Sequence, residues 1–227
     1  MKTRLGLLTI GQAPRPDGLA RDVAAIVGSD VEVIEHGALD GLSATELAAL
    51  RPGDADEALV TLLADGSNVV ITKNAVVERL QKHIDALEQA DVAAILLMCT
   101  GAFPTFRHRV PLIAPQMVLY AAVRAVAGGG RVGSLTPLER QVDAARRRWQ
   151  EQGVAEPLVV AADPYCADPL AAVRTAAESL RRDGASVCFL DCFGFDLAMR
   201  DAAREAFTGP VVLARSLAAR IAAEVMV

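Results

Sequence analysis

The stretch ILLMCTGAFP, residues 95–104, is an apolar run that stops at Cys99 and opens into a turn at Gly101. A second stretch, VCFLDCFGF, residues 187–195, repeats this pattern, because its apolar run ends at Cys192 just ahead of Gly194. Short apolar runs bounded by turn residues are typical of strands buried on both faces of a parallel sheet. We therefore expect two buried strands, each followed by a thiol.

Strand and helix patterns alternate around these two stretches. Apolar runs predict strands at residues 4–10, 31–39, 92–98, 131–136, 157–161, 186–191 and 210–214. Periodic segments predict helices at residues 15–28, 42–53, 73–90, 116–130, 137–153, 168–184, 195–207 and 215–227. This alternation, with short connections, indicates an α/β fold with largely parallel sheets.

Local signals refine three of these elements. Ser43 followed by Glu46 predicts a capping box at the start of a short helix. Asp65 and Gly66 between two apolar runs predict a hairpin within residues 58–72. The helix at residues 73–90 is expected to bury one apolar stripe, formed by Val77, Leu80, Ile84 and Leu87.

The repeated pattern predicts two pseudo-symmetric lobes, each a mostly parallel sheet flanked by helices. We assign residues 1–104 with residues 210–227 to the first lobe, and residues 105–209 to the second. No low-complexity linker separates the two halves. The last helix, from about Arg215, is apolar enough to pack back on the first lobe.

Composition excludes several classes of protein. The chain has 227 residues and a net charge of -5, and its Lys and Arg residues are scattered, which argues against a nucleic-acid partner. No apolar run approaches the ~18 residues of a membrane span, and the first residues do not form a convincing signal peptide. We expect a cytoplasmic protein with a small-molecule carboxylate as its partner and no membrane partner. Whether the chain forms a homodimer is left open.

The four cysteines are expected to be free thiols. Cysteines in cytoplasmic proteins are mostly reduced, and the spacing of these four does not match a structural zinc site, so we predict no metal site. Cys99 and Cys192 follow strands at the edge where α/β sheets bind ligands. The alternative is that each is a small core residue, which is our interpretation of Cys188. Cys166 lies in a loop and receives no role.

Four other residues are candidates for the site. Gln12 and Arg15 follow the first strand, where an arginine can grip a carboxylate bidentately, although Arg15 can equally cap a surface loop. Thr136 lies before Pro137 at the start of a predicted helix, where it can be an ordinary helix N-cap. Lys73 could face the same crevice or be solvated.

The three histidines give no metal-binding pattern. His83 falls on the side of its helix that we expect to be exposed, His36 ends a strand, and His108 lies in a basic loop. None has a carboxylate partner at metal-ligand spacing. The glycine-rich segments match no phosphate-binding loop, and the run of three glycines after residue 127 is interpreted as a helix stop.

Several motifs together resemble one known family over nearly the whole chain. LLTIGQAPRPD, ILLMCTG, FLDCFGF and PVVLARSLAARIAAEV resemble the AroM family, which is similar to the aspartate, glutamate and hydantoin racemase superfamily. This resemblance implies two α/β lobes with a cysteine from each at their interface. It also implies cofactor-independent chemistry, with the two thiols as acid and base.

The resemblance places the two thiols and their neighbours in the site. Cys99 and Thr100 match the first motif, although Gly101 makes it looser than the Cys-Asn-Thr of the relatives. Cys192 matches the second motif, where Asp191 replaces a glycine and Phe193 replaces a substrate-holding threonine.

These departures bear on both the substrate and the thiol. The missing threonine affects amino-acid recognition, and a carboxylate beside Cys192 would raise the pKa of its thiol. We assign Thr100, Gly101, Phe193 and Gly194 to substrate binding. The resemblance also implies that Thr136 holds a substrate carboxylate, because the relatives bind one at the start of the corresponding helix.

The predicted function is a racemase or isomerase in which Cys99 and Cys192 transfer protons on opposite faces of a carbon atom. Such a carbon lies next to a carboxylate or carbonyl, and it needs an acid and a base within hydrogen-bond reach. No cofactor is expected. Two alternatives stay open: an isomerase or decarboxylase that uses one cysteine, and a small-molecule binding protein without turnover.

Overall fold

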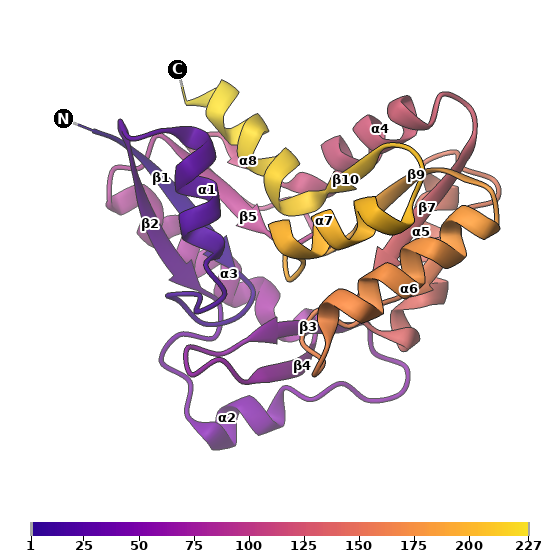
Figure 1. The fold of residues 1–227 in the computed structure, drawn as a ribbon. Coiled ribbons are helices and arrows are strands. Elements are labelled where there is room, and N and C mark those ends of the chain that lie inside the picture. The colour runs from indigo at the N-terminus through magenta and orange to yellow at the C-terminus, as the bar shows by residue number, and fades with distance from the viewer. Residues whose placement is uncertain (1, 227) are drawn as a thin grey trace. The chain divides into compact units, whose positions relative to one another are not determined.

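The computed structural model describes residues 2–226 and divides into two compact units (Figure 1). The first unit holds the residues up to Pro115 and those from Ala218 onward, and the second holds Gln116–Leu217. The sequence placed the two boundaries near residues 104 and 210. Both lie later in the chain, because each unit keeps the short edge strand that completes its sheet.

Four parallel strands form the sheet of the first unit. They are β1 (Thr3–Thr9), β2 (Val31–Gly37), β5 (Ala94–Met98) and β6 (Leu112–Ile113), in the order β2-β1-β5-β6. Strand β6 was not predicted, since it has two residues inside an irregular segment. Every residue of β5 is buried, as its uninterrupted apolar sequence predicted.

Helix α3 (Asn74–Gln89) covers one face of this sheet, and α1 (Leu19–Val27) connects β1 to β2. The predicted stripe of α3 is wrong at one position, because Val76 is fully buried and Val77 only partly. Leu80, Ile84 and Leu87 are buried as expected. Val76 lies four residues before Leu80 and therefore falls on the same stripe as the other buried residues, whereas Val77 lies at its edge.

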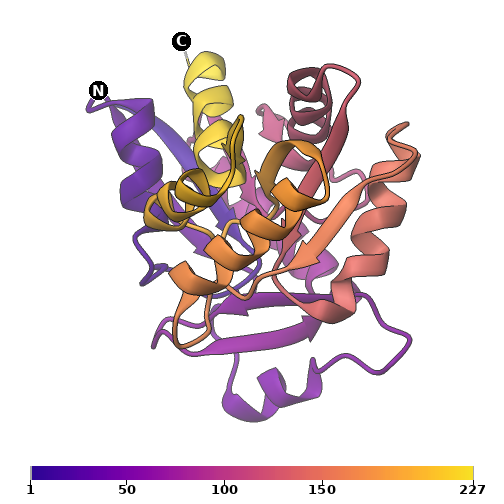
Figure 2. The ribbon, with the colours of Figure 1, turned by 45° about the vertical axis from the view of Figure 1, so that its right-hand side comes forward.

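The predicted hairpin is confirmed as β3 (Ala58–Leu62) and β4 (Asn68–Thr72), which pair antiparallel. It lies against the loop that follows β1, where the backbone amide of Gln12 donates to the Leu62 carbonyl at 3.1 Å. Figure 2 shows the two strands of the hairpin side by side. The predicted capping box of α2 (Ala44–Ala49) is also confirmed, since Ser43 and Glu46 bond to each other's backbone amides.

The second unit repeats the architecture of the first. Its sheet contains β7 (Arg131–Thr136), β8 (Leu158–Ala161), β9 (Ala185–Leu190) and β10 (Val211–Leu213), all parallel, in the order β10-β9-β7-β8. Its helices are α4 (Pro115–Ala127), α5 (Val142–Glu151), α6 (Pro169–Arg182), α7 (Leu197–Ala206) and the start of α8 (Ala214–Val225). A short 3-10 helix, η1 (Glu139–Gln141), precedes α5.

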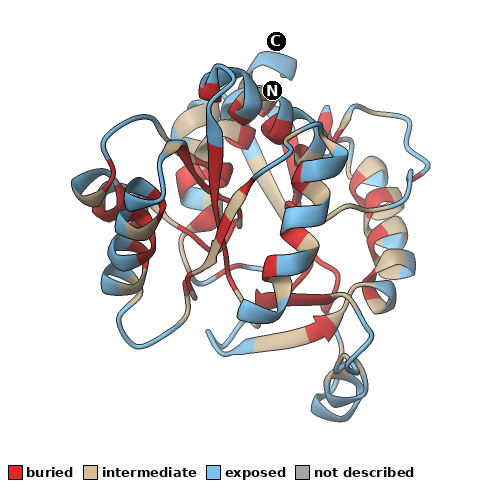
Figure 3. Ribbon diagram, turned by 90° about the vertical axis from the view of Figure 1, so that its right-hand side faces the viewer, coloured by how far each residue is buried: buried red, intermediate tan, exposed pale blue. Residues whose placement is uncertain are grey.

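The two faces of the second sheet carry different cores. Helices α6 and α7 pack on one face, against Leu135, Cys188 and Leu190. On the other face Tyr120 stacks on Trp149 with ring centroids 4.0 Å apart, and both rings meet Phe189 edge-on. Figure 3 shows buried strands between helices whose outer faces are exposed. The core interpretation of Cys188 is confirmed, and burial raises the pKa of this thiol to about 12.

Strand order makes the two units equivalent. Written in reverse, the second order becomes β8-β7-β9-β10, which matches β2-β1-β5-β6 strand for strand. Cys99 therefore follows β5 and Cys192 follows its counterpart β9. Each edge strand leads directly into a helix, β6 into α4 and β10 into α8. The predicted pair of pseudo-symmetric lobes is confirmed, and the C-terminal helix joins the first unit from Ala218.

Among the described helices, none combines the length and the apolar character needed to cross a membrane.

Candidate active site

The first thiol lies at the carboxyl end of β5. Cys99 is 8% exposed and packs with the core residues beneath α3. The backbone amide of Gly101 donates to the Cys99 sulfur over 3.4 Å. A side chain at Gly101 would meet only ordinary contacts, the nearest being that same sulfur at 3.4 Å. Thr100 is buried between the two.

The second thiol lies in a turn of the same form. Cys192 is half-buried, and the backbone amide of Gly194 donates to its sulfur over 3.3 Å. Phe193, between the two, is buried, so its ring is part of the packing. In both units the amide two residues after the cysteine points at the sulfur.

This contact has a chemical consequence in each unit. A hydrogen bond donated to sulfur stabilises the thiolate more than the thiol, since the thiolate is the stronger acceptor. Two sulfurs at equivalent strand ends, each with an amide donor, are suited to holding or releasing a proton. The local geometry of each turn therefore fits acid–base chemistry.

A buried arginine fixes the Cys192 turn. Arg215, in the first turn of α8, is 1% exposed and donates from Nε and Nη2 to the Phe193 carbonyl at 3.2 and 2.8 Å. Arg215 was not among the residues predicted from the sequence. Its signal was an arginine directly after an apolar strand, in the segment PVVLARSL.

The carboxylate of Asp191 points to the opposite face of the sheet from Cys192. Successive strand residues alternate between faces, so Asp191 joins Phe189 while Cys192 packs with the cluster beneath α6 and α7. Asp191 accepts a 2.6 Å hydrogen bond from the Tyr120 hydroxyl. Burial, and then the negative charge of Asp191, hold the pKa of Tyr120 well above its usual value. Asp191 is therefore bonded to α4, and its predicted effect on the pKa of the Cys192 thiol stays a prediction.

Arg15 is buried rather than at the surface, where one of the two interpretations placed it. It is 8% exposed, and its guanidinium grips Asp17 through Nη2 at 2.7 Å and Nε at 3.2 Å. Its Nη1 contacts the hydroxyls of Thr61 at 3.2 Å and Thr9 at 3.5 Å. The bidentate grip on a carboxylate predicted for this arginine is thus made within the chain, and its role toward a substrate stays a prediction.

Gln12 ties the loop after β1 to its neighbours. Its side-chain amide donates to the Leu39 carbonyl at 3.3 Å, and its side-chain oxygen accepts from the Ala64 amide at 2.9 Å. Both polar ends of this side chain therefore bond to the backbone. Substrate binding by Gln12, which the sequence suggested, remains untested.

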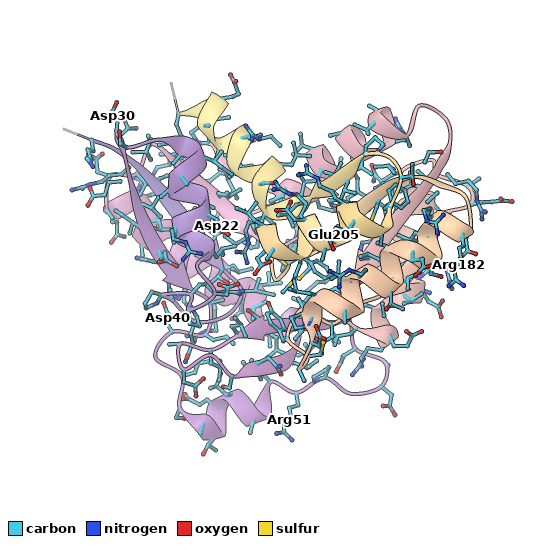
Figure 4. All side chains as sticks on the ribbon, in the orientation of Figure 1. Asp22, Asp30, Asp40, Arg51, Arg182 and Glu205 are labelled. Atoms are coloured by element: carbon cyan, nitrogen blue, oxygen red, sulfur yellow. The ribbon has the colours of Figure 1, made fainter. Side chains whose placement is uncertain are left out.

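Asp40 and Arg79 brace the same loop region. The Asp40 carboxylate accepts from the amides of Ala13 and Gly37, each at 2.8 Å (Figure 4 labels Asp40). Arg79 of α3 donates to the carbonyls of Ala38 and, at 2.8 Å, Asp40. The loops after β1 and β2 are thus joined by side chains.

Lys73 and Thr136 lie in settings that differ from the expected ones. Lys73 is half-buried and forms an ion pair with Glu57, at the residue before α3. Thr136 is the last residue of β7, so the N-cap interpretation is wrong, since η1 begins at Glu139. Its hydroxyl lies 3.3 Å from the Gln141 side-chain oxygen. Whether either residue binds substrate is still a prediction.

The end of each first strand carries a buried threonine. Thr9 ends β1 and Thr136 ends the equivalent strand β7. Only Thr136 was predicted from the sequence. Thr9 occupies the equivalent position because β1 and β7 correspond in the strand orders of the two sheets.

His83 is half-buried, which corrects its expected exposed position. Its Nδ1 lies 3.3 Å from Nδ1 of His36, and the two rings meet edge-on. Burial lowers the pKa of His83, and the charges of His36 and Arg79 lower it further, against an opposing effect of Asp40. Within residues 2–226, no three His, Cys, Asp or Glu side chains gather as a metal site.

The pH dependence of stability follows from His83. Because the pKa of His83 is lowered in the folded chain, the unfolded chain binds more protons just below its own pKa of ~6.5. The contribution of His83 to the free energy of unfolding is therefore fully present above this pH. It is lost as the pH falls toward the pKa of His83 in the folded chain. We expect His83→Gln to flatten the fall in unfolding free energy below about pH 6.5, measured by urea denaturation from pH 7.5 downward. His108→Gln, at an exposed position, should keep the wild-type slope; equal slopes in all three proteins would contradict this assignment.

Comparisons with known proteins agree with this architecture. A family model described as AroM protein matches residues 5–226. Allantoin racemase from Klebsiella pneumoniae has a TM-score of 0.65 at 15% identity, with 98% of this chain and 86% of that chain covered. No curated protein matches the sequence.

Two further solved structures have the same fold. Aspartate racemase from Picrophilus torridus has a TM-score of 0.60 at 13% identity, with 98% of this chain and 94% of that chain covered. Unliganded arylmalonate decarboxylase has a TM-score of 0.62 at 13% identity, with 99% and 92% covered. At such identities the likeness shows the fold alone.

Proposed function

This chain belongs to the AroM family, and from that premise we propose that it is a cofactor-independent racemase or isomerase. Its substrate is a small acid with a weakly acidic C–H bond next to a carboxylate or carbonyl. Cys99 and Cys192 transfer protons at that carbon atom, one on each face.

The matched sulfur contacts carry this proposal. In each unit a thiol follows the equivalent strand and accepts a hydrogen bond from the amide two residues later, at 3.4 Å for Cys99 and 3.3 Å for Cys192. The same arrangement in both units supports paired roles, and the racemases that have this fold support the reaction class.

The proposed reaction has two proton transfers. The thiolate on one side takes the proton of the C–H bond, so an S–H bond forms and the electron pair stays on carbon. The opposite thiol then gives its proton to the other face of that carbon, and its sulfur becomes the thiolate. The amides of the two turns are candidates to stabilise the charge that develops on the substrate oxygen.

A second candidate is a reaction that uses Cys192 alone. It is favoured by the difference in burial, since Cys99 is 8% exposed and Cys192 is half-buried. In a decarboxylation the substrate carboxylate leaves as carbon dioxide, and the thiol protonates the carbon that held it. The arylmalonate decarboxylase with this fold makes such a substrate worth testing.

Proton exchange in deuterated water tests both candidates. We expect the protein to exchange the C–H proton of L-aspartate or allantoin for deuterium, or to convert phenylmalonate to singly deuterated phenylacetate, as followed by proton NMR. Exchange with loss of optical activity supports the two-thiol reaction. The same compounds raising the melting temperature without exchange or carbon dioxide release would instead identify a binding protein.

We also propose a cytoplasmic location and no nucleic-acid partner. The net charge of -5 and the scattered basic residues support this.

A further inference from the structure

The loop after β8 brings a tyrosine to the Cys192 turn. Tyr165 is half-buried, and its backbone amide donates to the Asp163 carboxylate at 2.8 Å, which closes a tight turn. Pro164, between them, is buried. The loop is thus braced at the carboxyl end of the second sheet, and all of these residues belong to the second unit.

The hydroxyl end of Tyr165 lies on Gly194. A Cβ atom built on Gly194 would lie 2.4 Å from the Tyr165 hydroxyl oxygen and 3.0 Å from Cγ of Pro164. Any larger residue at Gly194 would therefore push this loop away, which is a physical reason for glycine there. Gly194 is also the residue whose amide donates to the Cys192 sulfur.

These contacts limit the distance between hydroxyl and thiol. The Cys192 sulfur is 3.3 Å from the Gly194 nitrogen. The Tyr165 hydroxyl oxygen is 2.4 Å from the Cβ position built on Gly194, and this position is one bond from the Gly194 Cα. Adding the N–Cα and Cα–Cβ bond lengths to these two distances places the Cys192 sulfur and the Tyr165 hydroxyl oxygen at most about 9 Å apart.

We propose that Tyr165 is a specificity-determining residue that donates a hydrogen bond to the carboxylate of an acid whose α-carbon lies against Cys192. The inference rests on the proposed function. A sulfur contacts a reacting carbon at about 3.5 Å, a carboxylate oxygen lies about 2.4 Å from that carbon, and a hydroxyl donates over about 2.7 Å. These lengths sum to about 8.6 Å, which covers nearly the whole range of separations that the Gly194 contacts allow, so one small carboxylate can reach both groups.

Alkylation of Cys192 tests this without knowledge of the natural substrate. Iodoacetate and iodoacetamide both alkylate a thiolate, which forms an S–C bond as iodide leaves, but only iodoacetate places a carboxylate on the attacked carbon. The experiment uses the full chain with Cys166→Ser, which removes the exposed loop thiol. The rate of each reagent at Cys192 is measured by mass spectrometry of the peptide that carries it.

We expect Tyr165→Phe to lower the iodoacetate to iodoacetamide rate ratio at least about fivefold, which is less than the full effect of losing a charge-assisted hydrogen bond. The iodoacetamide rate should not change, because this reagent has no carboxylate. Gly194→Ala should lower the ratio as well, because it displaces Tyr165 with its hydroxyl intact. Tyr120→Phe also removes a tyrosine hydroxyl, but from the opposite face of the sheet. This variant should leave the rate ratio unchanged.

Two other outcomes are distinguishable. An unchanged ratio in Tyr165→Phe, with Cys192 reactive, would overturn the role of Tyr165 and leave the proposed function intact. If Cys192 in the native protein reacts as slowly as the buried Cys188 with both reagents, the thiol is closed to small acids, and the proposed function fails together with this inference.

Discussion

Cys192→Ala is expected to lower the rate of proton exchange at the substrate carbon at least about 10³-fold, because it removes the acid–base group on one face. Cys99→Ala is expected to lower interconversion of the two enantiomers by a similar factor if both thiols act. Both rates are measured by proton NMR and polarimetry on a compound that the wild-type protein exchanges. Cys166→Ala is the matched control, because that thiol is exposed and lies outside both turns.

The pair of variants separates the mechanisms. Loss of activity in both supports proton transfer from two sides. Loss in Cys192→Ala with full activity in Cys99→Ala supports the single-thiol reaction. Wild-type rates in both variants would remove the thiols from the chemistry altogether and leave only the fold.

Arg215→Met is expected to lower the free energy of unfolding by about 3 kcal/mol, the cost of leaving a buried carbonyl without its charged donor. The Phe193 carbonyl accepts two hydrogen bonds from this guanidinium, so the turn that orients the Gly194 amide also loses its support. Activity should fall together with stability. Urea denaturation measures the first effect, and the exchange assay in the absence of urea measures the second.

Arg220→Met provides the matched control. Arg220 lies on the same helix, α8, but is exposed, so its replacement should change the unfolding free energy by no more than about 0.5 kcal/mol. An equal urea midpoint for the two variants would show that the buried position of Arg215 does not stabilise the fold.

The sequence predicted those elements whose signals are local. The capping box at Ser43 and the hairpin at Gly66 depend on residues within a few positions of each other, and both are confirmed. The buried strands before Cys99 and Cys192 follow from uninterrupted apolar runs, which only a covered sheet accommodates. The repeated pattern of strand and helix was sufficient to predict two related units.

Partners of individual side chains could not be predicted in the same way. The grip of Arg15 on Asp17 and the contact of His83 with His36 depend on how loops and helices meet in three dimensions. The hydrogen bond from Tyr120 to Asp191, 71 positions further on, could not be predicted either, because no motif connects the two residues. The effect of Asp191 on the adjacent thiol stays a prediction.

Arg215 was missed for a related reason. It lies 22 positions after the carbonyl that it binds, and no motif connects the two. The two edge strands were equally hard to assign to their units, since β6 has two residues and β10 has three. Their pairing with longer neighbours, rather than their own sequence, decides where each unit ends.

The stacking of Tyr120 on Trp149 gives the protein an optical probe. Trp149 is the chain's single tryptophan and lies in the core of the second unit, on the α4 and α5 face of its sheet. Its fluorescence therefore reports the denaturation of that unit alone, while far-ultraviolet circular dichroism reports the helices of both. Comparing the two signals during a melt distinguishes concerted from stepwise loss of the units without any added label.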